Sequence, residues 1–173
     1  MQRAAIVVVL PLFLLSCDRA PEFAPPEQRP PLESFKATPA RVVNMSDPDA
    51  PAHFFRDITD AAAPTWRWTG QRPAVRVRVR SRENVRYVID FTIAKTTFQD
   101  TGPVTVRFTV NDHVLDEARY ASPGPQHFEK PVPPEWLQEN KDAIAGAEID
   151  KIWVSKDDGA RFGFILSRIG LAQ

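Results

Sequence analysis

Three stretches of the chain alternate hydrophobic and polar residues with a period of two. They are residues 75–80, 87–93 and 104–110. Side chains two positions apart on an extended strand point to the same face, so each stretch predicts a β-strand with one buried and one solvated face. Asn111 and Asp112 follow the third stretch, and both residue types tolerate positive φ. We therefore expect a tight hairpin into a strand over residues 113–119.

The remaining signals are weaker. Clusters of turn-forming residues at 99–103 and 122–125 predict loops, and the two prolines and the acid at 133–135 predict the start of one short helix that runs to about Ala145. Two last strands are expected over 149–155 and 161–169, joined by a turn through Asp157, Asp158 and Gly159. Many short strands, spaced about 8 to 12 residues apart, predict an all-β fold, an antiparallel sandwich.

The first residues have a different pattern. Arg3 is followed by an apolar run over 4–15 and then by Ser16 and Cys17. A helix of that length rises about 18 Å, which is short of the roughly 30 Å hydrocarbon core of a bilayer. The run therefore indicates a processing segment, and Leu14-Leu15-Ser16-Cys17 resembles the lipobox of bacterial lipoproteins. A cleaved soluble protein and an uncleaved anchor are the alternatives.

The lipobox resemblance implies that cleavage follows Ser16 and that Cys17 carries acyl chains. Two or more chains hold a protein on a membrane durably, so the lipidation of Cys17 would fix the protein to the cell envelope, facing the periplasm. The segment from Asp18 to Pro39 contains six prolines and few apolar residues, which predicts an extended tether. A proline-rich ligand for a partner is the alternative. The predicted organisation is a signal peptide over 1–16, a lipidated cysteine and tether over 17–40, and a β-sandwich domain over 41–173.

Composition excludes several classes of function. The chain has 22 basic and 22 acidic residues, so bulk charge does not recruit nucleic acid. Cys17 is the only cysteine. Once it is modified, no thiol is left for a disulfide, a nucleophile or a thiolate metal site. The domain must rely on a single hydrophobic core, for which about 130 residues suffice.

The last strands carry a resemblance to a known fold family. Trp153, the turn at 157–159 and the segment Phe162-Gly163-Phe164-Ile165-Leu166 resemble the closing strand pair of galactose-binding-domain-like jelly rolls. The strand over 87–93, the end of a strand at Val110-Asn111 and the turn over 131–137 fit the same pattern. The likeness covers about residues 41–172 and implies a jelly-roll domain. Members of that group are mostly carbohydrate-binding or adhesive modules, although fold carries function poorly.

Tryptophans are the main candidates for ligand contact. Trp66 and Trp68 lie two residues apart and share one face of a strand, with Arg67 on the other face. If exposed, the pair is a platform for sugar rings; if buried, it belongs to the core. Trp153, near the acidic turn, and Asn111, at a hairpin, are further candidate contacts. Trp136 has the same two interpretations as Trp153.

Arginines and acids supply the other candidates. Arg76, Arg78 and Arg80 form a stripe that suits phosphate, acidic glycan, lipid head groups or a partner protein. Acids such as Glu83 and Asp90 on neighbouring strands are expected to neutralise it in the alternative interpretation. The turn at 157–159 is either a calcium site or, more simply, a turn.

Nothing in the chain indicates catalysis. The three histidines lie outside any metalloprotease or nucleophile-elbow motif, and there is no glycine-rich phosphate loop. The sequence therefore predicts a membrane-anchored, non-catalytic binding protein without cofactor or metal. Its partner is either an envelope glycan, bound at one end of the sandwich, or another envelope protein, docked on the arginine face.

Overall fold

A computed structural model describes residues 40–60 and 63–173. The signal peptide, Cys17 and the tether predicted from the sequence lie outside these residues. Within the described part of the chain, no helix has the length and apolar character needed to cross a bilayer.

The described residues form a β-rich domain with one α-helix, α1 (Lys95–Thr101), and two short 3-10 turns, η1 (Ala50–His53) and η2 (Pro134–Trp136). The strands are β1 (Val42–Asn44), β2 (Phe54–Ile58), β3 (Arg67–Val79), β4 (Arg86–Ile93), β5 (Val104–Val110), β6 (His113–Tyr120), β7 (Gly124–Pro131), β8 (Lys141–Ile149), β9 (Trp153–Val154), β10 (Arg161–Phe162) and β11 (Ile165–Ala172).

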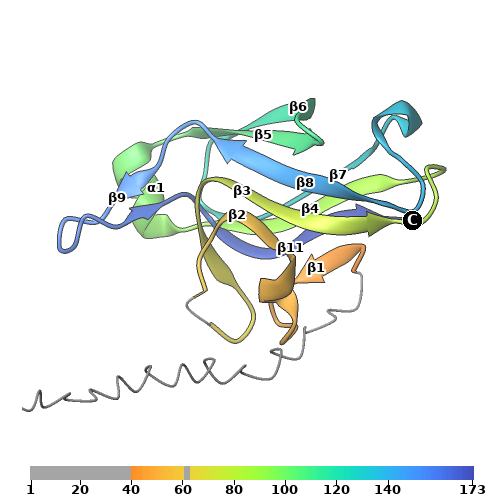
Figure 1. Ribbon diagram of the computed structural model, residues 1–173. Coiled ribbons are helices and arrows are strands. Elements are labelled where there is room, and N and C mark those ends of the chain that lie inside the picture. The colour runs from red at the N-terminus through yellow and green to blue at the C-terminus, as the bar shows by residue number, and fades with distance from the viewer. Residues whose placement is uncertain (1–39, 61–62) are drawn as a thin grey trace, which may run out of the picture. The chain divides into compact units, whose positions relative to one another are not determined.

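The strands follow the order β6-β5-β8-β3-β11-β4-β7, with β1 added to β11 and β2 added to β3. Every recorded strand pair is antiparallel. The long strand β3 contributes to both halves of the order: Arg67 and Trp68 pair with β11, and residues 74–79 pair with β8. Since its two ends pair with strands of different halves, β3 is the place where the sheet folds over into two layers (Figure 1). The expected antiparallel jelly-roll sandwich is confirmed.

Aromatic side chains from both layers meet in the core. Phe108 of β5 stacks on Phe128 of β7, with ring centroids 3.8 Å apart and an interplanar angle of 12°. Tyr87 of β4 is fully buried, and its hydroxyl donates a 2.9 Å hydrogen bond to the carbonyl oxygen of Gly146 in β8. This bond satisfies a polar group that would otherwise be costly to bury, and it joins the two layers.

The strands expected from the period-two stretches are confirmed as part of β3, as β4 and as β5. In each of them the hydrophobic positions of the alternating pattern are buried. The hairpin after Val110 is also confirmed, because Asn111 and Asp112 both have positive φ, 48° and 67°. A turn through 157–159 joins β9 to β10 as expected, and Gly159 has a φ of 71°.

The expected helix over 133–145 is wrong. Its start is only the single turn η2, and the chain then turns at Asn140, which has a φ of 55°. Residues 141–149 form β8, whose small side chains Ala143, Ala145 and Ala147 point into the core. The helix lies elsewhere, as α1, in a region expected to be partly loop.

Three further boundaries differ from the expectation. The predicted strand over 161–169 is divided into β10, which ends at Phe162, and β11, which begins at Ile165. The predicted loop over 122–125 runs into β7, which begins at Gly124. The predicted strand over 149–155 is split, because Ile149 ends β8 and β9 has only two residues.

Candidate functional site

Four aromatic rings gather where the N-terminal end of β3 meets the β9–β10 hairpin. We call Trp66, Trp68, Trp153 and Phe162 the aromatic array. Trp66 and Trp68 contact edge to face, with centroids 6.1 Å apart and an interplanar angle of 86°. The ring of Phe162 lies 4.9 Å from that of Trp68 and 6.0 Å from that of Trp153, stacked on the latter at 26°. The fold thus brings four rings that are far apart in the sequence into one continuous aromatic surface.

The array is separate from the hydrophobic core. All four side chains are half-buried, and none of them belongs to the core or to the partly buried hydrophobic residues packed against it. The core rings of Tyr87, Phe91 and Phe108, in contrast, are at most 1% exposed. Partial exposure of four adjacent rings is unusual for aromatic side chains in the interior of a small sandwich and is typical of a binding surface.

Backbone pairing between β3 and the segment before β11 positions the array. The Thr69 hydroxyl donates to the Phe164 carbonyl oxygen (2.9 Å) and accepts from the Phe164 amide (3.1 Å). Between Phe162 and Phe164, a Cβ on Gly163 would lie 2.3 Å from the carbonyl oxygen of Gly70. Only glycine permits this close approach, which sets Phe162 against Trp68.

Arg67 fixes the start of β3 from the opposite face. It is 6% exposed, and its Nη1 donates to the carbonyl oxygens of Ala63 (2.5 Å) and Trp66 (2.9 Å). The rings of Trp66 and Trp68 are in contact, and Arg67, which lies between them in the sequence, is buried. The tryptophans are not coplanar, and each leaves part of its ring accessible.

Polar groups border the array beside Trp153. The indole N–H of Trp153 donates to the carboxylate of Asp100 (2.6 Å). Asp100 is the second-last residue of α1. Lys151 donates to the carbonyl oxygens of Thr101 (3.0 Å) and Pro103 (2.7 Å) and so holds the same loop. Asp100 is exposed and has a second carboxylate oxygen, so it can accept a hydrogen bond from a ligand at the edge of the rings.

The acidic turn near the array is held by its own hydrogen bonds. The Ser155 hydroxyl and the Ala160 amide both bond to Asp158 and lower the pKa of its carboxyl. Among residues 40–60 and 63–173, no group of three or more His, Cys, Asp or Glu side chains is placed to hold a metal ion. The structure thus gives the turn a local role in closing the β9–β10 hairpin.

Asn111 lies away from the array, and both ends of its side-chain amide have partners. Its Nδ2 donates to the Trp136 carbonyl oxygen and its Oδ1 accepts from the Ile144 amide, both at 2.8 Å. Trp136 itself stacks on His113, with centroids 4.9 Å apart. These residues join η2 to β8 and the β5–β6 turn, so the structure separates them from Trp66, Trp68 and Trp153. Phe162 is the array member that the sequence did not single out as a site.

The arginine stripe lies on the outer face of β3, beyond the array. Arg76 and Arg80 are exposed, and the Arg76 guanidinium carbon lies 5.5 Å from the centroid of the Phe55 ring. Arg78 forms an ion pair with Asp142 of β8 at 3.1 Å.

Neither acid expected to neutralise this stripe forms an ion pair with it. Asp90 instead bonds Arg168 (2.7 Å) and His127 (2.5 Å) on the outer face of the other layer, and Glu83 has no recorded ion pair among the described residues. In that network Arg86 also bonds Glu129 and lowers the pKa of its carboxyl.

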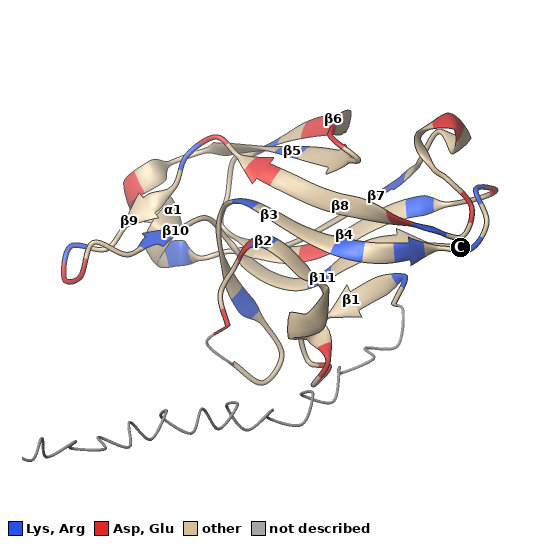
Figure 2. Ribbon diagram, in the orientation of Figure 1, with Lys and Arg blue, Asp and Glu red and all other residues tan. Residues whose placement is uncertain are grey.

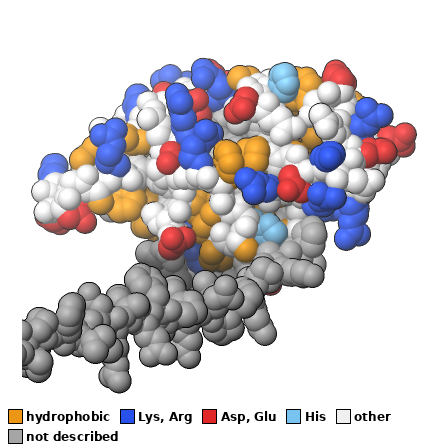
Figure 3. Space-filling model, in the orientation of Figure 1, with side chains coloured by type: hydrophobic (Ala, Val, Ile, Leu, Met, Phe, Trp, Pro, Cys, Tyr) orange, Lys and Arg blue, Asp and Glu red, His pale blue; other side chains and the backbone are white. Residues whose placement is uncertain are grey.

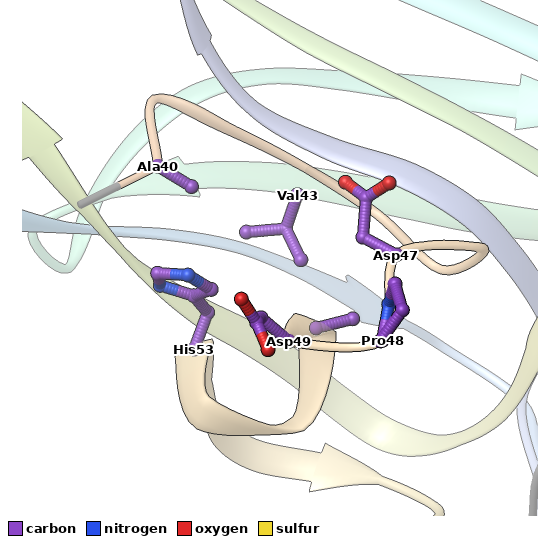
Figure 4. Close-up of a pocket in the computed structure, with 7 residues that line it drawn as sticks. Ala40, Val43, Asp47, Pro48, Asp49 and His53 are labelled. Atoms are coloured by element: carbon purple, nitrogen blue, oxygen red, sulfur yellow. The ribbon is translucent and has the colours of Figure 1, made fainter. Parts of the chain in front are cut away.

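A pocket of about 330 Å³ lies where the chain enters the domain, between β1 and η1 (Figure 4). The side chain of Val43 lies between those of Asp47, Asp49 and His53, which also line the pocket. Asp47 is used within its own turn, because the Asn44 side-chain amide donates to its carboxylate (3.2 Å). The lining of the pocket contains no Phe, Tyr or Trp.

Comparison with known proteins gives one weak structural likeness. No protein-family model matches the chain, and no curated protein matches its sequence. The chain is similar to the solved structure of a family 35 carbohydrate-binding module from Clostridium thermocellum. The TM-score is 0.38 and the sequence identity 11%, over 69% of this chain and 87% of that chain. A likeness this weak does not carry a ligand or a site from one protein to the other.

Proposed function

We propose that the chain is a lipid-anchored envelope lipoprotein, facing the periplasm, whose folded domain binds carbohydrate through the aromatic array without chemistry of its own. The observation that carries the proposal is the half-buried array of Trp66, Trp68, Trp153 and Phe162, which lies outside the core. The array is the largest group of accessible aromatic rings in contact with one another in the described domain.

The chemistry of the array suits a sugar. A pyranose ring has an apolar face of C–H groups and a polar rim of hydroxyls. Aromatic rings bury apolar surface and have a negatively polarised face, which complements C–H groups. Asp100 supplies a carboxylate at the edge of the rings, where it can accept hydrogen bonds from hydroxyl groups. Apolar walls with a few placed polar groups are the usual composition of a small-molecule site.

A purely structural role for the array is the main competing explanation. The β9–β10 hairpin has only two paired residues on each side, and the contacts of Phe162 and Trp153 help to hold it on β3. That role accounts for the stacking of Phe162. It does not account for Trp66, which lies at the far end of the array and contacts Trp68 by its edge.

The anchoring part of the proposal rests on the sequence. Arg3, the apolar run over 4–15 and Cys17 have the order of a lipoprotein signal, and the prolines after Cys17 give the domain reach. The domain is then held at the surface of the cell envelope, where glycans are abundant.

A glycan array probed with residues 18–173 tests carbohydrate binding directly. We expect selective retention of one class of glycan, measured against the same chain with Trp68→Ala and Phe162→Ala. If no glycan is retained, and a pull-down from envelope extracts returns one specific protein instead, the domain is an accessory subunit and the carbohydrate proposal is wrong.

A further inference from the structure

Four arginines cluster around the C-terminal half of β3. Arg76 and Arg78 alternate with buried valines on this strand, and Arg80 follows its last residue, Val79. Arg41 lines the same groove as Arg78 and Arg80. We call Arg41, Arg76, Arg78 and Arg80 the arginine cluster. Basic residues appear as blue bands along this part of β3 in Figure 2.

Among residues 40–60 and 63–173, only one of the four arginines forms an ion pair. Asp142 pairs with Arg78 at 3.1 Å. Within the part of the chain that the structure describes, no ion pair is recorded for Arg41, Arg76 or Arg80. Guanidinium groups held close together attract an anion more strongly than each would alone, because their potentials add.

An exposed phenylalanine lies within the cluster. Phe55 is 48% exposed, and Arg76 covers one face of its ring. Figure 3 shows a hydrophobic patch near the centre of this face, with several basic side chains and some acidic ones around it. Cations around an aromatic or aliphatic side chain are typical of surfaces that lie on a membrane interface.

The polypeptide enters the domain at this cluster. Ala40 is the first described residue, and its carbonyl oxygen accepts a 2.8 Å hydrogen bond from the Arg78 amide. Arg41 follows directly, and the Leu171 amide donates to its carbonyl oxygen (2.8 Å). Ala40 also lines a groove with Arg76 and Arg78. The segment that leads back to Cys17 therefore begins beside the arginines.

We propose that the arginine cluster and Phe55 dock onto the anionic phospholipid surface of the membrane to which Cys17 is attached. This inference rests on the anchoring part of the proposed function and not on carbohydrate binding. Phosphate groups of lipids accept the forked hydrogen bonds of arginine, and a tether that begins at the cluster keeps the cluster near the bilayer. Asp47 and Asp49 line the neighbouring pocket and mark the limit of the basic surface on that side.

Docking in this way orients the domain. Trp68 and Arg78 are ten positions apart on β3, at most about 33 Å along an extended strand. The β9–β10 hairpin and the C-terminal end of β3 lie at opposite ends of the sandwich (Figure 1). With the arginine cluster on the lipid, the aromatic array faces away from the membrane and is free to meet a glycan.

Vesicle binding by residues 18–173, which lack the lipid anchor, tests the surface itself. The probes are vesicles of phosphatidylcholine with and without 30% phosphatidylglycerol. Each basic residue near an anionic surface contributes about fivefold. Arg41, Arg76 and Arg80, which form no ion pair with the described residues, and Phe55 therefore predict half-maximal binding at an accessible lipid concentration on the order of 1 mM. We expect this binding only with phosphatidylglycerol and only at low salt.

Two triple variants of equal net charge provide the comparison. Arg41→Gln/Arg76→Gln/Arg80→Gln is expected to weaken vesicle binding about 100-fold. The control, Lys95→Gln/Arg119→Gln/Lys156→Gln, removes three exposed cations elsewhere and is expected to bind as the parent does. Equal losses in both variants, or no binding by the parent, would overturn the proposal.

A single label then reports the orientation. Residues 18–173 contain no cysteine, so Phe55→Cys and Val154→Cys each offer one site for an environment-sensitive dye. The two positions are 48% and 47% exposed. We expect the dye at 55 to shift to the blue on anionic vesicles and the dye at 154, beside the aromatic array, to stay unchanged. A shift at 154 without one at 55 contradicts the orientation.

The two proposals fail separately. Loss of vesicle binding leaves the glycan array result untouched, and membrane fractionation reports the anchor at Cys17 independently of both. If the parent chain ignores anionic vesicles while a crosslinker at position 76 captures one envelope protein in intact cells, the arginine cluster is a protein-docking surface.

Discussion

The Thr69 hydroxyl is bonded to both the carbonyl oxygen and the amide of Phe164, 95 residues later in the chain. Thr69 is fully buried, and its own amide also donates to the Phe164 carbonyl oxygen (3.0 Å). Thr69 follows Trp68 in the sequence, and Phe164 lies two residues after Phe162, whose ring contacts that of Trp68. It ties the stability of the fold to the geometry of the aromatic array.

Replacing Thr69 by valine tests this connection. Thr69→Val removes both side-chain hydrogen bonds and leaves the buried Phe164 amide without a partner, so we expect a loss of about 1–3 kcal/mol in the free energy of unfolding. Denaturant unfolding measures it. Thr69→Ser keeps the hydroxyl and is expected to lose less; equal losses in the two variants would mean that the hydroxyl contributes little.

Gly163 permits the close approach of β10 to β3. A Cβ added there would meet the Gly70 carbonyl oxygen at 2.3 Å, so Gly163→Ala must displace one of the two segments. We expect a destabilisation of about 1–3 kcal/mol together with a changed near-ultraviolet circular dichroism of the tryptophans. Gly159→Ala, in the same hairpin, places its Cβ in open space at a φ of 71°. It is expected to cost about 1 kcal/mol of backbone strain and to leave the tryptophan signal unchanged.

Because of Tyr87, the free energy of unfolding is expected to decrease at alkaline pH. Burial raises the pKa of its hydroxyl well above 10, and the nearby Tyr120 adds to the shift. The folded state thus holds this proton more tightly than the unfolded state. Its stabilising contribution is complete below the unfolded pKa of about 10 and is lost as the pH rises through the folded value.

The variant Tyr87→Phe tests this pH dependence. It loses the hydrogen bond to Gly146, so we expect it to be about 1 kcal/mol less stable at pH 7. Above pH 10 the stability of the variant is expected to fall less steeply than that of the parent chain. The two slopes are expected to differ by up to about 1.4 kcal/mol per pH unit. Urea unfolding between pH 7 and 11 measures both effects. Tyr120→Phe, at a half-buried hydroxyl, is the comparison; an unaltered alkaline slope in Tyr87→Phe would contradict the assignment.

The strands that are predicted correctly each have one buried and one solvated face. The alternation of Val75, Val77 and Val79 with arginines reflects one buried and one solvated face, which sequence records directly. The segment over 141–145 is wrongly predicted as the end of a helix because alanine favours helices and Pro133-Pro134-Glu135 resembles a helix start. The sheet overrides that propensity, since small side chains at 143, 145 and 147 fill a layer opposite the aromatic core.

The candidate site was only partly accessible to sequence reasoning. The spacing of Trp66 and Trp68 indicates a shared face, and in the structure the two rings are in contact. The contribution of Phe162 depends on a pairing across 95 residues and on the absence of a Cβ at Gly163, neither of which leaves a local pattern. Asn111 is predicted as a ligand contact because its side-chain amide is polar and lies at a hairpin. In the structure, both ends of that amide form hydrogen bonds with backbone groups that are distant in the sequence.

The anchor predicts a clear result in cells. Cys17→Ala removes the only thiol that can take a diacylglycerol, so we expect the protein to leave the membrane fraction or to keep residues 1–16. Detergent partitioning and intact mass measure the two outcomes. An unchanged mass together with unchanged membrane extraction would show that Cys17 is not lipidated.

Calorimetric titration of the folded domain with the glycan selected on the array tests the central claim most directly. Trp68→Ala is expected to weaken binding about 30-fold, because a contact tryptophan typically contributes 2 kcal/mol or more. Trp136→Ala, which removes a half-buried tryptophan outside the array, is expected to leave the affinity unchanged. Equal affinities for Trp68→Ala and the parent chain, with both variants folded, would contradict the aromatic array as the carbohydrate site.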